Sequence, residues 1–174
     1  MAGKPCVPRK LTRADVREGF DSREKVEGRA PELDEWLARF SWQNQRANDS
    51  VTYVSVLDGR VVGYYAIAVA NVTSESAPVA VVKGAPRQVP FLLLARLAVD
   101  RSMQGFGLGR ALLIDALRRT VGIAESVGIR ALLVHARDDA ARQFYLAQAE
   151  FLESPSDPLH LLLPVKDIVR AHTP

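Results

Sequence analysis

The sequence contains very little cysteine and histidine, which limits the sites it can hold. One cysteine, Cys6, occurs among 174 residues, together with three histidines. A disulfide within the chain needs two cysteines, so a disulfide framework is excluded. The histidines are scattered and show no Cys/His spacing typical of a metal site, so we expect no metal in the function.

Long hydrophobic runs are also absent. No uninterrupted apolar stretch approaches the roughly 18 residues of a transmembrane helix. The first ten residues, MAGKPCVPRK, include basic side chains but no apolar run follows them, so no signal peptide is expected. We therefore expect a cytoplasmic protein with no membrane partner.

The overall composition is that of a globular protein. Hydrophobic residues make up 48% and charged residues 25% of the chain, and the length suits one domain with a sizeable core. The formal net charge is +3, a mild basic excess. It is compatible with nucleic-acid binding and equally with an ordinary solvated surface. Because no internal repeat or linker is visible, we predict a single domain over residues 1–174.

The amino-terminal half shows first helical and then strand periodicity. A helix is predicted to begin near Pro31. Its apolar face, at i, i+3, i+4 and i+7 spacing, consists of Leu33, Trp36, Leu37 and Phe40. Residues 51–57 and 61–70 flank Asp58-Gly59, a pair that favours the tight turn of an antiparallel hairpin. Residues 71–90 are rich in Ser, Pro and Gly and predict a long irregular loop.

The remaining half alternates strands and helices. Residues 90–100 are almost continuously apolar, as expected for a strand buried on both faces. The elements predicted after the following glycines are a helix ending near Gly128, a strand over 129–136, a helix over 138–149 and a strand over 159–165. This order predicts an α/β domain with a mixed sheet.

The stretch QGFGLGRA, residues 104–111, joins the apolar strand to the next helix. Glycines at a helix start expose successive N–H groups, which favour an anion such as phosphate. The P-loop is excluded because Arg110 and Ala111 follow Gly109, where that loop needs Lys and Ser/Thr. The dinucleotide fingerprint is disfavoured because Arg110 stands where its third glycine belongs.

Two motifs together resemble one family. The pattern Gln104-x-x-Gly107-x-Gly109, between a buried strand and an amphipathic helix, is similar to the pyrophosphate-binding motif (Q/R)-x-x-G-x-(G/A) of the Gcn5-related N-acetyltransferase (GNAT) family. The segment DDAARQFY resembles the N-x-x-A-x-x-F-Y helix start of that family, with Asp138 in place of the usual Asn.

The flanking segments narrow the resemblance. LDEWLARF, VVGYYAIA, LARLAVD and FLESPSDPLHLLLP look like one branch, the acetyltransferase toxins of bacterial toxin–antitoxin pairs, which acetylate the amino group of aminoacyl-tRNA. The similarity covers most of residues 20–165 and is strongest over 91–163. It implies the GNAT fold, in which a mixed central sheet splays between two parallel strands and is flanked by helices.

The resemblance also implies the residues of an acetyl-CoA site. Backbone groups of Leu97, Ala98 and Val99 would pair with the pantetheine arm and polarise the acetyl carbonyl. The residues assigned to the pyrophosphate are Gln104, Gly105, Phe106, Gly107, Leu108, Gly109, Arg110 and Ala111, and Asp138 of the second motif is added to the coenzyme set. Tyr145 is the predicted general acid for the departing thiolate; its alternative is a core tyrosine.

The strand FLLLARLAV contains no Asp or Glu that could deprotonate an amine. An acceptor lysine, with a pKa of about 10.4, commonly needs such a base, whereas a free α-amino group titrates near 7.7 to 8.0. The absence therefore favours an aminoacyl-ester acceptor, although His135 or a water could serve as base. Cationic residues expected to contact RNA are Arg96, Arg137, Arg142, Lys83 and Arg87, each with solvated surface charge as its alternative.

Three functions remain open at this stage. The toxin branch implies an aminoacyl-tRNA substrate, a ribbon–helix–helix antitoxin and a homodimer. The first alternative is an acetyltransferase for a small amine or a protein amino terminus. The second is a coenzyme-binding module without catalysis, against which the presence of Tyr145 counts.

Overall fold

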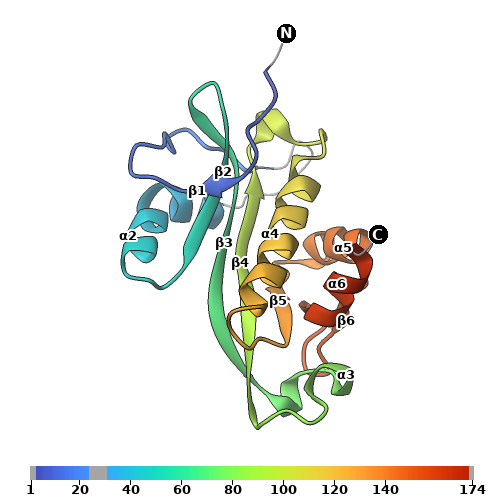
Figure 1. The fold of residues 1–174 in the computed structure, drawn as a ribbon. Coiled ribbons are helices and arrows are strands. Elements are labelled where there is room, and N and C mark those ends of the chain that lie inside the picture. The colour runs from blue at the N-terminus through green and yellow to red at the C-terminus, as the bar shows by residue number, and fades with distance from the viewer. Residues whose placement is uncertain (1–2, 24–30, 173–174) are drawn as a thin grey trace. The chain divides into compact units, whose positions relative to one another are not determined.

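The computed structural model describes residues 3–23 and 31–172, and the chain divides into two compact units. Unit 1 comprises Met1–Ala68 and Arg96–Asp115, and unit 2 comprises Val69–Ala95 and Ala116–Pro174. Figure 1 follows the elements along the chain by colour.

The elements, in chain order, are β1 (Arg9–Lys10), α1 (Pro31–Glu35), the π-helix η1 (Trp36–Phe40), α2 (Ser41–Arg46), β2 (Val51–Leu57), β3 (Arg60–Thr73), the 3₁₀ helix η2 (Ser74–Ser76), α3 (Val79–Val82), β4 (Gln88–Val99), the 3₁₀ helix η3 (Arg101–Met103), α4 (Leu108–Ala124), β5 (Ala131–His135), α5 (Asp139–Gln148), β6 (Leu152–Glu153), β7 (His160–Pro164) and α6 (Val165–His172). The strands are hydrogen-bonded in the order β1-β2-β3-β4-β5-β7-β6. β4 and β5 are parallel, whereas β2–β3 and β5–β7 are antiparallel. The predicted α/β class with a mixed sheet is confirmed.

Unit 1 is built on the β2–β3 hairpin. Asp58 and Gly59 both have positive φ, +48° and +78°, which is the geometry of the tight turn that their sequence predicts. Side chains alternate across the hairpin, so Tyr64 packs with Leu37 in a buried cluster on one face. On the other face, a Cβ at Gly63 would lie only 3.0 Å from side-chain carbons of Leu108 and Leu112.

Helices therefore cover both faces of this hairpin. Leu37 of η1 packs on the Tyr64 face, and Leu108 and Leu112 of α4 lie against the Gly63 face. The absence of a side chain at Gly63 allows α4 to approach β3 closely. The start of α4, where the glycine-rich stretch ends, is thus set by its packing on the hairpin.

The helix predicted from Pro31 is present, but its register changes at a π-helix. Leu37 is fully buried as predicted, whereas Phe40 is 44% exposed and the prediction for Phe40 is wrong. A π-turn bonds residue i to i+5 and advances the side chains by a smaller angle per residue than an α-turn. Phe40 is therefore rotated off the buried face that α-helical spacing predicts.

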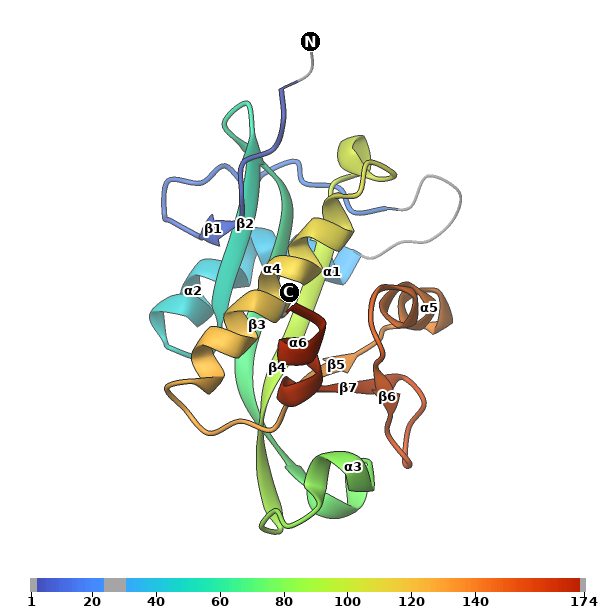
Figure 2. The ribbon, with the colours of Figure 1, turned by 45° about the vertical axis from the view of Figure 1, so that its right-hand side comes forward.

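Unit 2 contains the other end of the sheet. Leu92, Leu93 and Leu94 of β4 pair with Leu132, Leu133 and Val134 of β5, which in turn pairs with β7. Figure 2 shows β5, β7 and β6 side by side. Phe91, Leu133 and Leu162 lie in the buried cluster of this unit.

The loop expected over residues 71–90 is shorter than predicted. β3 continues to Thr73 and β4 begins at Gln88, with η2 and α3 between them. The strand β6, which has two residues, and the helix α6 were not predicted. Among the described residues, no helix is long and apolar enough to cross a membrane.

Candidate active site

The glycine-rich stretch forms the turn between η3 and α4 in unit 1. Gly105 and Gly107 have φ of +83° and +81°, a backbone conformation that residues other than glycine rarely adopt. The amide of Ala111 donates to the carbonyl of Gly107 at 3.1 Å, which closes the first helical turn. The N–H groups before Ala111 have no acceptor within the helix, so this helix start can bind an anion.

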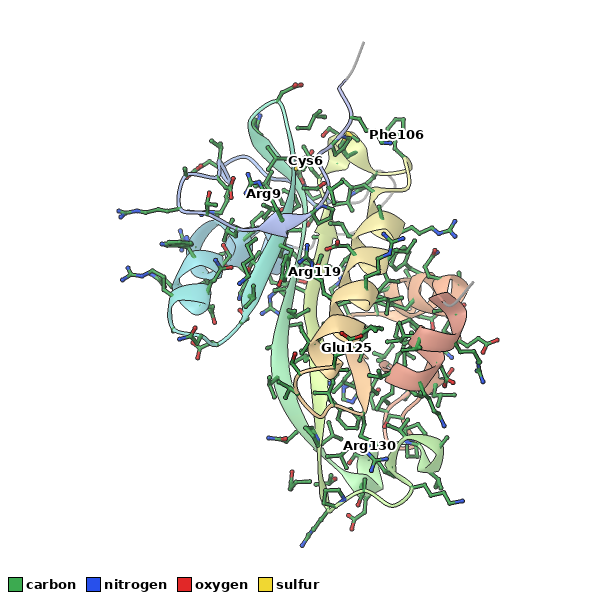
Figure 3. The ribbon with its side chains drawn as sticks, viewed as in Figure 1. Cys6, Arg9, Phe106, Arg119, Glu125 and Arg130 are labelled. Carbon is green, nitrogen blue, oxygen red and sulfur yellow. The ribbon has the colours of Figure 1, made fainter. Side chains whose placement is uncertain are left out.

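Phe106 lies between the two glycines. Its side chain is 73% exposed, and Figure 3 shows it at the outer edge of the loop. Because its neighbours are glycines, the backbone on either side of Phe106 is open to a ligand. The assignment of these loop residues to the pyrophosphate stays a prediction.

The side chain of Gln104 holds this turn to the backbone around it. Its amide nitrogen lies 3.1 Å from the carbonyl oxygen of Val99, 3.2 Å from that of Ser22 and 3.3 Å from that of Arg23. Gln104 was predicted as a coenzyme residue. In the structure its amide N–H groups are directed at protein carbonyls.

Asp100, which the sequence analysis did not single out, caps η3. Its carboxylate accepts hydrogen bonds from the amide and the hydroxyl of Ser102 at 3.0 and 2.6 Å, and from the amide of Asp21 at 2.9 Å. The pattern Asp-x-Ser directly after a strand is typical of such a capped turn and could have identified it.

Arg96 lies on β4 and is half-buried. Its guanidinium carbon is 5.1 Å from the ring centre of Trp36, and Trp36 stacks on Tyr64 with ring centres 5.9 Å apart. A cation over an aromatic ring gains about 0.5 to 2 kcal/mol, depending on its exposure. This contact explains how an arginine is accommodated on an otherwise apolar strand. Trp36, interpreted from sequence as core, packs against the buried cluster of unit 1 as well as contacting Arg96.

Tyr145 lies on α5 in unit 2 and is 7% exposed. Its ring contacts Phe144 and Phe151 edge-on, at centre distances of 5.2 and 5.9 Å. Burial raises the pKa of the Tyr145 hydroxyl above its ordinary value near 10. The group is therefore a protonated, neutral phenol throughout the physiological range.

The Tyr145 hydroxyl differs from those of other buried tyrosines. The Tyr64 hydroxyl donates to the carbonyl of Leu33 at 2.7 Å, and the Tyr65 hydroxyl donates to Asp115. Within residues 3–23 and 31–172, the Tyr145 hydroxyl makes no hydrogen bond. It is consequently available to a ligand.

Asp138 is the N-cap of α5. Its carboxylate accepts from the amide of Ala141 at 2.8 Å. This hydrogen bond and the neighbouring Arg137 hold the pKa of Asp138 below its ordinary value. The second motif therefore begins a helix as predicted, and the observed contact of Asp138 is a capping bond.

Within unit 2, the cationic residues predicted for RNA do not form one cluster. Arg137 pairs with Asp138 at 3.0 Å, and Arg142 pairs with Asp139 at 3.4 Å and with Glu153. Lys83 and Arg87 are exposed in the segment between α3 and β4, and within unit 2 Figure 2 shows α3 and α5 well separated. Arg96 belongs to unit 1.

His135, considered as a base, stacks on the ring of His160. The two ring centres are 3.9 Å apart with an interplanar angle of 20°. Burial, and then the neighbouring His160, lower the pKa of His135. The contact gives His135 a structural role at the paired ends of β5 and β7.

The profile of the acetyltransferase (GNAT) family matches residues 15–151. The chain belongs to the GNAT family. This membership agrees with the glycine-rich turn before α4 and with the mixed sheet. A GNAT protein is an acetyltransferase by family, and acetyl transfer is thus the class of reaction to which the site belongs.

A curated relative extends the comparison over nearly the whole chain. The tRNA-acetylating toxin of Mycobacterium tuberculosis (strain ATCC 25618 / H37Rv) is 46% identical over 161 residues, which cover 92% of this chain and 93% of the toxin.

Solved structures show the same fold. The structure of AtaT complexed with acetyl-methionyl-tRNAfMet has a TM-score of 0.84 at 26% identity and covers 95% of this chain and 98% of AtaT. A tyrosine-to-phenylalanine mutant of AtaT bound to the C-terminus of the antitoxin AtaR and acetyl-CoA has a TM-score of 0.79 at 25% identity. It covers 99% of this chain and 100% of the mutant.

Proposed function

We propose that this protein is a toxin-type N-acetyltransferase that transfers acetyl from acetyl-CoA to the α-amino group of aminoacyl-tRNA and so blocks translation. The 46% identity to a tRNA-acetylating toxin over most of both chains supports this substrate class. The AtaT complexes with acetylated tRNA and with acetyl-CoA support the same pairing of donor and acceptor.

The coenzyme fits unit 1 at the start of α4. The amides of Gly105–Arg110 would hold the pyrophosphate, since both positive-φ glycines leave that backbone uncovered, whereas the Ala111 amide is bonded to the Gly107 carbonyl. Leu97, Ala98 and Val99 lie beyond the part of β4 that is paired with β5, which covers Leu92–Leu94. Their backbone groups are the ones we assign to the pantetheine arm, with the Val99 carbonyl already accepting from Gln104.

Tyr145 is assigned as the general acid. The observation that supports the proposal is that its buried hydroxyl makes no hydrogen bond within the described residues. As the amine nitrogen bonds to the acetyl carbon, the carbon–sulfur bond breaks and the thiolate leaves. Tyr145 gives its proton to that sulfur and regains one from solvent, while the amine loses one. A phenol whose pKa is raised by burial stays protonated at neutral pH and can supply this proton.

The acceptor amine needs little help from the protein. No Asp or Glu occurs between Phe91 and Val99, and an aminoacyl amine, with a pKa of at most about 8, is substantially neutral at physiological pH. The missing carboxylate therefore suits an aminoacyl ester better than a lysine.

RNA contacts are assigned to cations of both units. Arg96 beside Trp36 would contact the aminoacylated terminus of the tRNA. Lys83 and Arg87 are exposed and would contact backbone phosphates. Arg137 and Arg142 remain in the proposal, although each would have to exchange a carboxylate for a phosphate.

The partners follow from the function. A toxin of this kind needs an antitoxin, as AtaT has in AtaR, and we propose that the antitoxin here is a ribbon–helix–helix protein. We further propose a homodimer, a single domain over residues 1–174 and, because charged tRNA is cytoplasmic, a cytoplasmic location.

The test is transfer of labelled acetyl from acetyl-CoA to a pool of charged tRNA. We expect nuclease digestion to release N-acetylaminoacyl-adenosine with wild type and far less with Tyr145→Phe. Uncharged tRNA is the matched control and should take no label. Label on peptides or small amines, with none on charged tRNA, would favour the alternative acetyltransferase.

A further inference from the structure

A short segment of unit 1, Asp21–Arg23, lies against the end of β4 and the glycine turn; we call it the strap. The Asp21 amide donates to the Asp100 carboxylate at 2.9 Å, and the Arg101 amide donates to the Asp21 carbonyl at 2.7 Å. Gln104 adds its side-chain amide to the carbonyls of Ser22 and Arg23. Each residue of the strap is thus bonded to the η3–glycine turn region.

The strap is also closed on itself. The Arg23 guanidinium donates to both oxygens of the Asp21 carboxylate, at 2.7 and 2.6 Å, and the Arg23 amide donates to the same group at 3.0 Å. These bonds lower the pKa of Asp21 to about 2, so its carboxylate stays ionised at any physiological pH. The ion pair therefore connects the two ends of the strap.

The opposite side of the strap is bonded to α1. The Ser22 amide donates to the Asp34 carboxylate at 3.0 Å. The next turn of this helical segment carries Trp36, which lies under Arg96 and on Tyr64. A continuous chain of contacts thus runs from the glycine turn through the strap to the Trp36–Arg96 pair.

Gln104 is suited to hold this chain together. Its carboxamide has two N–H donors, and three backbone carbonyl oxygens lie 3.1 to 3.3 Å from the nitrogen. A side chain of the same length without donors would fill the space but leave these carbonyls without that partner. Gln104 accordingly links two backbone segments through hydrogen bonds of its side-chain amide.

We propose that Gln104 and Asp100 are positioning residues that couple the coenzyme loop, through the strap, to the Trp36–Arg96 pair. Coenzyme binding orders the loop and, through these hydrogen bonds, α1, so that aminoacyl-tRNA binds more tightly to the loaded enzyme. The coupling is reciprocal, since two ligands that stabilise one arrangement raise each other's affinity equally. This inference rests on the proposed function for the identity of the two ligands.

The experiment is hydrogen exchange with and without coenzyme A. In wild type we expect coenzyme A to slow exchange at least about fivefold, the lower end of typical coupling, both in residues 107–111 and in residues 32–40. In Gln104→Met the slowing over 107–111 should remain and that over 32–40 should disappear. The KM for aminoacyl-tRNA should rise at least about fivefold in this variant, with kcat changed less than about twofold.

Gln45→Met is the matched control. The Gln45 side chain makes the same kind of tie, donating to the Leu11 carbonyl at 2.9 Å and accepting from the Thr52 amide at 3.0 Å, away from the strap. We expect Gln45→Met to keep wild-type coupling whatever it costs in stability. Gln104→Arg, which supplies N–H donors again, should restore protection over 32–40.

The outcomes separate the inference from the proposed function. If coenzyme A slows exchange nowhere in wild type, the proposed function fails. If coenzyme A slows exchange in residues 107–111 of wild type but leaves the exchange rate of residues 32–40 unchanged, only the coupling is overturned. Wild-type protein alone is sufficient for this comparison. Equal protection of 32–40 in Gln104→Met and wild type would also overturn it.

Discussion

Replacing Tyr145 by Phe tests whether the Tyr145 hydroxyl has a catalytic or a structural role. The substitution removes one oxygen and keeps the ring contacts with Phe144 and Phe151. Because this hydroxyl makes no hydrogen bond within the described residues, its removal breaks no protein contact. We expect the free energy of unfolding to change by less than about 0.5 kcal/mol, which shifts Tm by about 1 to 2 °C for a chain of this size.

The kinetic effect should be far larger. Loss of a general acid lowers the rate about 10²- to 10⁴-fold, which corresponds to about 3 to 5 kcal/mol of transition-state stabilisation. Single-turnover acetylation of charged tRNA at saturating acetyl-CoA measures this rate. Affinity for coenzyme A, measured by calorimetry, should stay within about twofold of wild type, because the hydroxyl acts on the departing sulfur.

Tyr65→Phe is the control with the opposite outcome. It removes a hydroxyl that donates to the Asp115 carboxylate, and loss of a hydrogen bond to a charged group costs about 1.5 to 3 kcal/mol. Tm should fall by about 3 to 12 °C, with the acetylation rate unchanged at a temperature where both variants are folded. A Tyr145→Phe enzyme that keeps wild-type kcat, or loses stability as Tyr65→Phe does, refutes the assignment.

Three further predictions address the loop, the cap and the phenol. Gly105→Ala and Gly107→Ala each place an L residue at positive φ, which should lower the free energy of unfolding by about 1 to 2 kcal/mol and weaken coenzyme A binding in calorimetry. The control is Gly122→Ala, inside α4 with no atom near the added Cβ. It should instead raise the free energy of unfolding by about 0.5 to 1 kcal/mol. Asp138→Ala should cost about 1 kcal/mol in urea unfolding, whereas Asp138→Asn keeps the cap. The pKa of Asp138 is lowered in the folded state. The ionised carboxylate therefore contributes to stability above the unfolded pKa near 3.9, and this contribution is lost as pH falls through the folded pKa. Asp138→Asn should show no such loss of stability. Burial raises the pKa of Tyr145. The difference in absorbance at 295 nm between wild type and Tyr145→Phe should therefore show no phenolate up to about pH 10. A phenolate at pH 9 would contradict the burial of this hydroxyl.

The sequence predicts those elements whose cause is local. Asp58-Gly59 adopts the positive φ values that its turn type requires, and Gly105 and Gly107 do the same in the loop. Asp138 caps its helix through the side-chain chemistry common to Asp and Asn. In each case the backbone conformation depends on the residue itself, so a single sequence is sufficient.

Features that depend on distant packing could not be predicted. Nothing around Phe40 indicates a π-helix, and the exposed ring follows from that change of register. Gln104 was assigned to a ligand because its motif is defined by ligand binding. Its contacts with Ser22 and Arg23 join residues more than 80 positions apart, and no spacing rule connects them.

Gly63 has a consequence for how this protein can evolve. It is not one of the assigned site residues, yet a Cβ there would lie only 3.0 Å from side-chain carbons of Leu108 and Leu112 at the beginning of α4. The direction of the amides at the start of α4 thus depends on a residue that lies more than 40 positions earlier in the chain. If variants are selected for loss of acetyl transfer, we expect substitutions at Gly63 among them, although Gly63 is not a catalytic residue.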